Sequence, residues 1–471
     1  MVSYTGIRAP AFFFTHAFHL ASSRMNATLP PGPKVHPLSL IADLAGRGPL
    51  IVTNPRKYFE DLHNEYGSIV YSDFGIGRFY ITNNLALIRK VFVGEPRSYA
   101  KADAYKEAAH FLGNGILNSE GDFWQAQRQM VQPAFTKSRL NMFVDTMVEV
   151  SDKAAKNLSA EADVSSLSMH IALENICRFL FGEDFAANEK TIREAVHFGN
   201  NFISRRIQAP FKLPVYFPSF NNLRFFFHRF ELDTILYRII DERARQNELG
   251  KDLLAMLIAA ERERNSGQIR RQQVRDEILT LLIAGHETTG YTLAMALWLL
   301  ARNNDIQQRL RAELRSVAGG KWTVETFDST PLLEAVVNET LRLYPAAWII
   351  GRKILADEEF EGFLLKKDSQ LQTGIIALHR NKDWWSEPDR FKPERFLGEN
   401  SEPAQKQAFM PFGAGPRRCI GSVFAMLEMQ VAIARIVSQY QLTPAQDGEP
   451  EIEYLFTARL KNALPVRFTR L

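Results

Sequence analysis

The sequence predicts a mainly α-helical protein with a few short β-rich segments. Apolar residues recur at helical spacing through most of residues 141–247. The longest helical pattern covers residues 272–303, and a helix of that length extends about 48 Å, enough to cross a domain. Runs of β-forming residues are found at 69–83, where two glycines suggest a hairpin, and at 346–355 and 370–378.

Composition and charge limit the class of protein. Hydrophobic residues make up 46% of the 471 residues, which fits a globular protein rather than a disordered one. The formal net charge of +4 is small for this length and gives no support to nucleic-acid binding. Two cysteines, Cys177 and Cys419, make no disulfide framework, so we expect a cytoplasmic protein in which Cys177 is inert core.

The first 28 residues are expected to form a flexible leader before a single domain at 29–471. Residues 11–21, AFFFTHAFHLA, are apolar but short, whereas a membrane-spanning helix needs about 20 apolar residues. A signal peptide would need a longer apolar run. A true span and weak membrane-surface association are the less favoured alternatives. The proline-rich segment 29–33, LPPGP, is expected to be a stiff hinge after the leader.

The segment 411–421, PFGAGPRRCIG, is predicted to present one cysteine sulfur to a metal. Cys419 lies just before a helical stretch, where the positive end of a helix favours a thiolate. Neighbouring arginines lower the pKa of a thiol further. Gly413 and Gly415 permit unusual backbone angles and let a flat ligand approach closely. The alternative is a buried structural cysteine beside a turn.

This segment resembles the haem-binding loop of the cytochrome P450 family. The matching residues are Phe412, Gly415, Arg417, Cys419 and Gly421. Such fixed residue types at fixed spacing rarely coincide, and the resemblance covers nearly the whole chain. It implies haem b as cofactor, with Cys419 as axial ligand of the iron. It also implies that Arg417 meets a haem propionate and that Phe412, Gly413 and Gly421 contact the cofactor.

A second string, within residues 115–139, carries Trp124 and Arg128 on one helix face. By the same resemblance, both side chains donate to a haem propionate, which the planar fork of arginine suits. Arg352, in the strand-like run 346–355, is expected to reach a propionate as well. The alternative for the pair is a core tryptophan beside a surface arginine.

The predicted helix 272–303 is apolar except at its centre, where AGHETTG interrupts it. Buried polar groups without partners destabilise a protein, so the interruption indicates a functional site. His286 and Glu287 resemble the start of a zinc-protease motif, but that motif needs a histidine where Gly290 stands.

The same residues match the oxygen-activation segment of the haem-thiolate family. In this resemblance Ala284 and Gly285 leave room for the haem face and bound oxygen. Thr288 and Glu287 then deliver protons, because a hydroxyl can relay them and a carboxyl can pass them inward from solvent.

A charged cluster is expected on the cysteine side of the haem. Glu339 and Arg342 lie three residues apart on a predicted helix, and the family completes this pair with an arginine from a later loop. Arg395 is the candidate for that arginine. The three residues are expected to be structural, fixing the backbone that carries Cys419.

Seven phenylalanines lie between Phe211 and Phe230. In the resembled fold this region is a mobile roof over the substrate, and so many rings suit either a greasy roof or ordinary helix packing. The roof interpretation suggests an apolar substrate such as a fatty acid, alkane or terpene.

The resemblance implies a monooxygenase, with haem between helix 272–303 and the Cys419 loop, that inserts one atom of O₂ into an apolar substrate. The chain ends soon after this loop, so electrons are expected from a separate ferredoxin and its reductase. Lys137, Arg139, Arg417 and Arg418 could form the docking face. We expect a monomer. A peroxide-using peroxygenase, a haem-thiolate isomerase and a non-enzymatic haem sensor are the alternatives.

Overall fold

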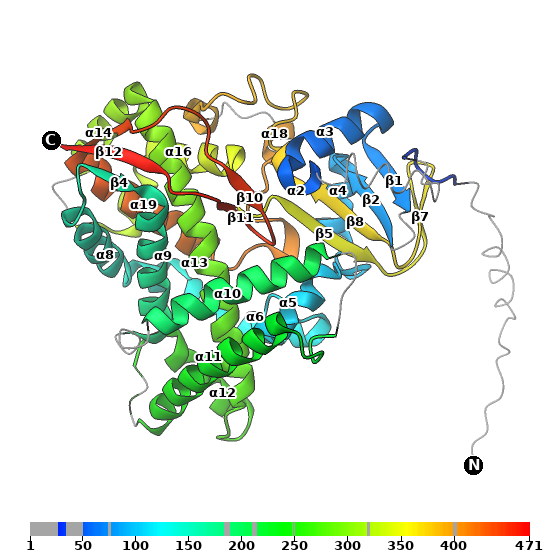
Figure 1. Cartoon of the computed structure of the whole chain (residues 1–471), viewed down its shortest axis with the longest axis horizontal. Coiled ribbons are helices and arrows are strands. Elements are labelled where there is room, and N and C mark those ends of the chain that lie inside the picture. The colour runs from blue at the N-terminus through cyan, green and yellow to red at the C-terminus, as the bar shows by residue number, and fades with distance from the viewer. Residues whose placement is uncertain are drawn as a thin grey trace, which may run out of the picture.

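The computed structural model describes most of the chain. The described residues are 27–33, 50–73, 77–182, 189–209, 214–246, 248, 250–317, 321–398 and 403–471. Helices dominate, and the largest sheet lies at one side of the molecule (Figure 1). The prediction of a mainly helical fold with a small β-rich part is therefore confirmed. Of the predicted leader, only the last two residues belong to the described part.

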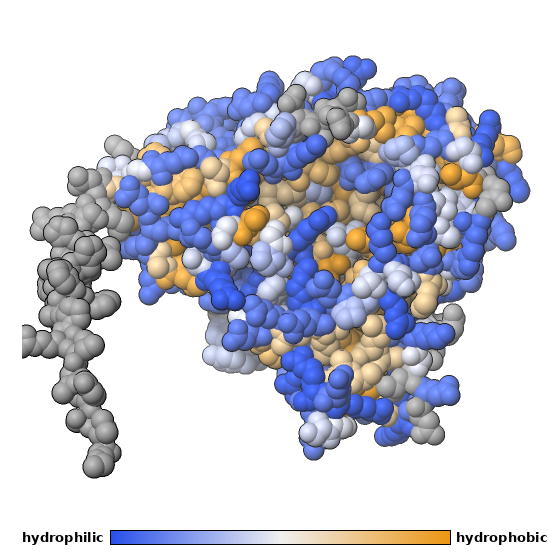
Figure 2. Space-filling view, turned by 180° about the vertical axis from the view of Figure 1, so that it is seen from behind, coloured by the Kyte–Doolittle hydropathy of each residue, from blue (hydrophilic) through white to orange (hydrophobic). Residues whose placement is uncertain are grey.

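Helices supply most of the described structure. They are α2 (Leu50–Thr53), α3 (Pro55–Tyr66), α4 (Leu85–Arg89), α5 (Ala104–Leu112), α6 (Gly121–Val131), α7 (Lys137–Asn141), α8 (Val144–Lys156), α9 (Val164–Phe181), α10 (Glu189–Gln208), α11 (Phe220–Arg245), α12 (Leu253–Arg264), α13 (Arg271–Arg302), α14 (Asn304–Val317), α15 (Val324–Asp328), α16 (Pro331–Leu343), α17 (Ile375–Leu378), α18 (Pro403–Ala408) and α19 (Ser422–Gln439). None of these described helices is long and apolar enough to cross a membrane. Seen from behind, the surface is largely hydrophilic, with apolar residues between the polar ones (Figure 2).

Side chains at helix ends explain several boundaries. Asp163, Ser219 and Asp252 precede α9, α11 and α12, and each side chain accepts a hydrogen bond from a backbone N–H of the first turn. Helix α9 ends before Gly182, whose φ of +66° favours glycine. Helices α9, α10 and α11 are thus separate helices within the region where helical spacing was predicted.

The largest sheet brings distant segments together. Its strand order is β1 (Ile69–Asp73), β2 (Arg78–Thr82), β8 (Gln370–Gly374), β5 (Ile349–Ile354) and β3 (Tyr99–Lys101). Strands β1 and β2 form the predicted hairpin, although its turn at 74–76 lies outside the described residues. Strand β3 pairs with β5 so that Lys101 stands opposite Arg352. This register places two cations beside each other.

Smaller sheets hold the remaining strands. They are β4 (Glu161–Asp163), β12 (Pro465–Arg470) and β9 (Tyr440–Pro444) in one sheet, β10 (Ile452–Tyr454) with β11 (Ala458–Leu460), and β6 (Glu358–Phe360) with β7 (Phe363–Leu365). Residues 27–33 lie against the β-rich part, where the N–H of Tyr71 donates to the carbonyl of Pro31 at 3.0 Å. The proline-rich segment is therefore attached to the fold.

Helix α13 passes through the middle of the helical part (Figure 1). It packs closely on α9 because glycines face that helix: a Cβ at Gly290 would lie 2.5 Å from the sulfur of Met169. Helix α13 also contacts α19, which begins three residues after Cys419. Helix α13 therefore contacts the helix that directly follows the cysteine loop.

Candidate active site

The loop that carries Cys419 is held by its own backbone and by a neighbouring segment. The N–H of Cys419 donates to the carbonyl of Phe412 at 2.9 Å. Gly415 begins the short helix η5 (Gly415–Arg417) with a φ of +68°, and a Cβ there would lie 1.9 Å from the carbonyl oxygen of Phe92. A larger residue at position 415 would strain the backbone and displace the loop.

Three other residues of the loop have different surroundings. Phe412 is partly buried and packs against the main hydrophobic core. Gly413 has a φ of +69° with open space around it, so only its backbone angle requires glycine. Gly421 directly precedes α19, and its backbone makes a hydrogen bond to the Cys419 thiol.

The Cys419 side chain is accessible to a water-sized sphere, although burial raises the pKa of its thiol. Both observations fit a sulfur that faces an internal space. The hydrogen bond from Gly421 and the charges of Arg128 and Arg418 lower the pKa, but burial outweighs them. The neighbouring arginines therefore act in the direction expected from the sequence, and desolvation of the charged form opposes them. A bound metal cation would stabilise the thiolate.

The centre of α13 also has accessible atoms inside the molecule. Ala284 is exposed and Thr288, one turn later on the same face, is partly exposed, whereas most of the helix is buried. A Cβ at Gly285 would instead lie 2.9 Å from the side chain of Ile176 on α9. The lack of a side chain at Gly285 therefore serves helix packing, while its role beside a ligand stays a prediction. Room is left at Ala284.

The acid and the alcohol of α13 make separate hydrogen bonds. Thr288 Oγ1 donates to the carbonyl of Ala284 at 2.7 Å. Glu287 Oε2 accepts from Thr457 Oγ1 at 3.2 Å, in the turn between β10 and β11. Burial raises the pKa of Glu287, while the nearby side chains of Asn200, Arg459 and Thr457 partly oppose the shift. The carboxyl is therefore easier to protonate than an exposed glutamate.

Trp124, Arg128 and Arg417 come together as predicted. The guanidinium of Arg417 lies 4.1 Å from the centre of a Trp124 ring, and that of Arg128 lies 5.7 Å from it. Arg128 Nη1 also donates to the carbonyl of Arg418 at 2.9 Å. Arg417 forms an ion pair with Glu120, the residue that precedes α6. This arrangement links α6 to the cysteine loop.

Lys101 is a cation that sequence reasoning missed. Its Nζ donates to the carbonyls of Ile116 and Ser119 at 3.0 Å each. Burial lowers the pKa of Lys101 to about 7, and the charges of Arg417 and Arg352 add to the shift. No motif could have identified it, because its neighbours are set by strand pairing rather than by local sequence.

Arg352 lies in the same cluster of cations. Its Nη1 donates to the carbonyl of Gly351 at 2.9 Å, and its guanidinium lies 4.5 Å from the Phe92 ring centre. Burial lowers the pKa of Arg352, which Glu120 and the Tyr105 phenol partly oppose. Glu120 is the carboxylate that counters Arg352 and Arg417 alike. Partly buried cations in excess over carboxylates favour an anionic ligand such as the propionates of haem.

The predicted contacts among Glu339, Arg342 and Arg395 are present and buried. Arg342 Nε lies 2.7 Å from Glu339 Oε2, and Arg395 Nε lies 3.2 Å from Glu339 Oε1. Arg342 Nη1 also donates to the carbonyl of His379 at 2.8 Å, and the ring of His379 accepts from the N–H of Met410 at 3.0 Å. The cluster on α16 is therefore connected to the start of the cysteine loop.

The predicted docking face needs one correction. Arg417 points inward to Trp124 and Glu120, so it does not belong to an outer surface. A groove of about 680 Å³ lies beside the cysteine loop, with Lys137 and Arg418 among its lining residues. Lys137 Nζ pairs with Asp328 in this groove at 3.0 Å.

The phenylalanine-rich segment does not form an inner roof. Of its described rings only Phe225 is buried, whereas Phe217, Phe220, Phe226, Phe227 and Phe230 are exposed. Phe211 lies outside the described residues. These exposed rings therefore give no support to the expectation of an apolar substrate.

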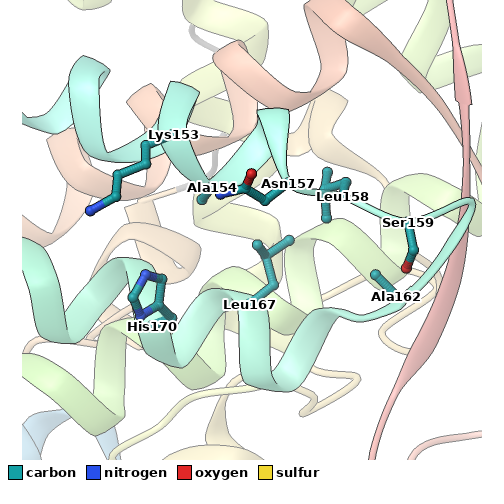
Figure 3. A pocket seen from close by; sticks show the side chains of 8 residues that line it. All are labelled: Lys153, Ala154, Asn157, Leu158, Ser159, Ala162, Leu167 and His170. Atoms are coloured by element: carbon teal, nitrogen blue, oxygen red, sulfur yellow. The ribbon is translucent and has the colours of Figure 1, made fainter.

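A separate cavity of about 330 Å³ lies between α8 and α9, where Leu167 projects between Lys153 and Ser159 (Figure 3). His170 lies at the same end as Lys153. None of the residues predicted for the site lines this cavity.

Comparison with known proteins agrees with this geometry. A family model described as Cytochrome P450 matches residues 30–468. Cyclooctat-9-en-7-ol 5-monooxygenase of Streptomyces melanosporofaciens is 31% identical over 80% of this chain and 83% of its own length. Cyclooctatin synthase of the same organism is 30% identical over 85% and 88%, and cytokinin hydroxylase of Arabidopsis thaliana is 31% identical over 72% and 68%.

Solved structures share the fold. The heme domain of a cytochrome P450DA mutant superposes with a TM-score of 0.81 at 22% identity, covering 94% of this chain and 98% of its own. Retinoic acid bound cyanobacterial CYP120A1 gives 0.79 at 24% identity, covering 94% and 100%. The chain therefore belongs to the cytochrome P450 family of monooxygenases, which bind haem through a cysteine thiolate.

Proposed function

We propose that this P450 inserts one atom of O₂ into an apolar organic substrate held between α13 and the Cys419 loop. The observation that carries the proposal is accessible surface at two places, the centre of α13 and the Cys419 loop. Ala284 and Thr288 are accessible in a mostly buried helix, and accessible Cys419 lies on the loop that leads into α19, a helix that contacts α13.

The residues around this space suit haem. Cys419 would hold the iron, while Trp124, Arg128, Arg352, Arg417 and Lys101 would surround the propionates. The excess of cations over carboxylates near Glu120 supports this assignment. When bound, a haem with a thiolate ligand supplies the activation of O₂.

Glu287 and Thr288 are proposed to move protons toward the accessible space. The hydroxyl of Thr288 borders that space, and its bond to the Ala284 carbonyl can be exchanged for one to a substrate or water. Burial makes Glu287 easier to protonate, and Thr457 and Asn200 orient its carboxyl from outside α13.

The proposed substrate is a cyclic, mostly hydrocarbon alcohol or alkene. The names of two relatives refer to cyclooctatenol oxidation and cyclooctatin synthesis, which favours such a skeleton over a fatty acid. The phenylalanine-rich segment exposes most of its described rings, so the proposed substrate class rests on the relatives and not on this segment.

The electron donor is proposed to be a separate acidic ferredoxin that docks at the groove beside the cysteine loop. Lys137 and Arg418 line this groove, and complementary charge speeds encounter in a salt-dependent way. Reversing charge with Arg418→Glu should slow reduction at low salt and weaken its salt dependence. An unchanged rate and salt dependence would place the docking face elsewhere.

The overall proposal is tested with the purified, haem-loaded protein. Carbon monoxide added after reduction should shift the Soret band to the position typical of a thiolate ligand, and Cys419→Ser should abolish that shift. Candidate cyclic alkenols should then perturb the Soret band, and labelled O₂ should leave one labelled oxygen in the product. A spectrum unaltered by Cys419→Ser, or product without label, would contradict the proposal.

A further inference from the structure

The segment 113–120 leads into α6, and α13 holds it from one side. Asp276 Oδ2 accepts from the N–H of Asn114 at 2.8 Å. Glu277 Oε2 accepts from the N–H of Ile116 at 3.0 Å. Two neighbouring carboxylates of α13 therefore fix the backbone of this segment.

Two glycines let the segment lie this close to α13. A Cβ at Gly113 would lie 2.2 Å from the carboxylate of Asp276, and a Cβ at Gly115 would lie 2.4 Å from Thr280 Oγ1. The segment thus packs directly on the helix, so a change in the side chains of α13 is passed to its backbone.

Two cations hold the carbonyl groups of the same segment. Lys101 Nζ donates to three of them, the carbonyls of Ile116, Leu117 and Ser119. Arg417 Nη1 donates to the carbonyl of Ser119 at 2.9 Å. Because both cations are bound to the segment, its position decides where their charges lie.

A carboxylate at position 277 is not explained by the hydrogen bonds alone. Glu277 is fully buried, and its Oε1 accepts from Gln273 Nε2 at 3.0 Å. A glutamine could also accept the N–H of Ile116, and an amide costs less free energy to bury than a carboxylate does. The charge of Glu277 therefore points to a partner of opposite charge.

Lys101 is that partner, and the two charges influence each other across the segment. Burial raises the pKa of Glu277 to about 7, and Lys101 partly opposes the shift. Burial also lowers the pKa of Lys101 to about 7, and the charges of Arg417 and Arg352 add to this shift. Glu120 and Glu277 oppose it. Glu277 therefore helps Lys101 to keep the proton that an anionic ligand requires.

We propose that Glu277 is a positioning residue for the propionate side of the haem. It holds the segment 113–120, and through this segment it holds Lys101 and Arg417 where their charges meet the propionates. The inference rests on the proposed function, in which these cations surround the propionates. Glu277 acts through the segment, because its two carboxylate oxygens already accept hydrogen bonds from Ile116 and Gln273.

Two substitutions in the haem-loaded protein separate the hydrogen bond from the charge. Glu277→Met keeps a similar side-chain length but leaves the N–H of Ile116 without its acceptor. The amide hydrogens of 113–120 should then exchange with solvent about tenfold faster than in wild type. Glu277→Gln keeps an acceptor, so exchange should stay within about twofold of wild type.

The reduction potential of the haem is a readout that packing alone would not move. Both variants lack the carboxylate, so the difference between them measures the placement of the cations. Glu277→Met should have a lower potential than Glu277→Gln, because displaced cations no longer stabilise the added electron. In a Lys101→Met background this difference should be smaller, since one of the two positioned charges is gone.

Glu261 supplies a matched control on α12. It is also a fully buried carboxylate that accepts a backbone N–H, from Arg270 at 3.2 Å. Glu261→Met should speed amide exchange around Arg270 but leave the reduction potential as in wild type. An equal change of potential in Glu261→Met and Glu277→Met would assign the effect to lost packing and overturn the inference.

The haem site itself is tested separately by the Cys419→Ser comparison. If wild type shows the thiolate spectrum with carbon monoxide, the proposed function stands whatever happens at Glu277. With that spectrum present, unchanged amide exchange in Glu277→Met would overturn the inference. Equal reduction potentials of Glu277→Met and Glu277→Gln would overturn it as well. Glu277→Leu has the same expected results as Glu277→Met and replaces it if that variant does not fold.

Discussion

Helix α13 and the first half of α11 both depart from the usual distribution of polar and apolar residues, but in opposite directions. Helix α13 buries His286, Glu287 and Thr289 at the centre of the molecule, whereas α11 exposes Phe220 and Phe230 at its edge. Buried polar groups cost free energy unless they are paired, and exposed rings gain nothing from the fold. The direction of the departure therefore separates chemistry inside the protein from contact with something outside it.

Substitutions on the two faces of α11 should have the most different effects on the free energy of unfolding. Phe225→Ala should lower the free energy of unfolding by about 3–5 kcal/mol, because its buried ring packs against Phe202 with centres 4.2 Å apart. Phe227→Ala should change it by about 0.5 kcal/mol or less, since that ring is exposed. Denaturant unfolding of the two variants measures the difference. Equal losses would mean that Phe227 is part of the core after all.

The polar residues Glu287 and Thr288 at the centre of α13 should matter for activity far more than for stability. Thr288→Val and Glu287→Gln keep shape but remove the hydroxyl or the acid, and each should lower product formation about 100-fold. The expected readout is product formed per electron consumed, with the lost oxygen released as peroxide. The unfolding temperature of Thr288→Val should stay near that of wild type, and Glu287→Gln should not unfold at a lower temperature than wild type. Loss of stability with unchanged product yield would show that these groups serve packing instead.

Enlarging small residues of α13 should have two different effects, on stability at one position and on substrate binding at another. Gly290→Val should lower the free energy of unfolding by about 1–3 kcal/mol, because even the Cβ of the new side chain would lie 3.1 Å from the Cα of Met169. Ala284→Val should cost little stability, since that position is accessible, but it should weaken or redirect substrate binding. Thermal unfolding and substrate-induced Soret shifts distinguish the pair. A similar loss of stability at both positions would argue against free space at Ala284.

Local motifs carried much of the site from sequence alone. The bounds of α13 differ from the predicted 272–303 by a single residue at each end, because its helical pattern is long and uninterrupted by proline. Glu339, Arg342 and Arg395 meet as predicted, since two of them share one helix face. The bounds of α13 and the Glu339–Arg342 pair rest on short-range spacing, whereas Arg395 was predicted from the family resemblance.

Long-range contacts and burial could not be predicted in the same way. Lys101 comes close to Arg352 and Arg417 because of the register of β3 on β5 and the path of the cysteine loop. Neither can be predicted from the residues next to Lys101 in the sequence. The phenylalanines of α11 were assigned to the interior because both faces of the helix are apolar, and periodicity then cannot tell which face is buried. Glu428 was missed because its burial follows from the packing of α19.

Glu428 extends the comparison to a buried acid outside the proposed chemistry. Its side chain is 1% exposed, and burial raises its pKa well above the ordinary value, a shift that Asn175 on α9 partly opposes. An unfolded glutamate titrates near pH ~4.3, so above that pH the unfolded chain loses a proton that the folded protein keeps. Wild-type stability should therefore fall as pH rises from ~4.3 toward the folded pKa, by up to about 1.4 kcal/mol per pH unit from this group.

Glu428→Gln removes that dependence while keeping a polar side chain opposite Asn175. The variant should unfold at higher denaturant concentration than wild type at pH 8, with a smaller difference at pH 5, and its product yield should be unchanged. Glu287→Gln is the matched variant, because burial also raises the pKa of Glu287. Its stability relative to wild type should change with pH in the same direction as that of Glu428→Gln, and it should also lose product. If Glu428→Gln lost product as Glu287→Gln does, burial of an acid in this fold would not by itself distinguish stability from chemistry.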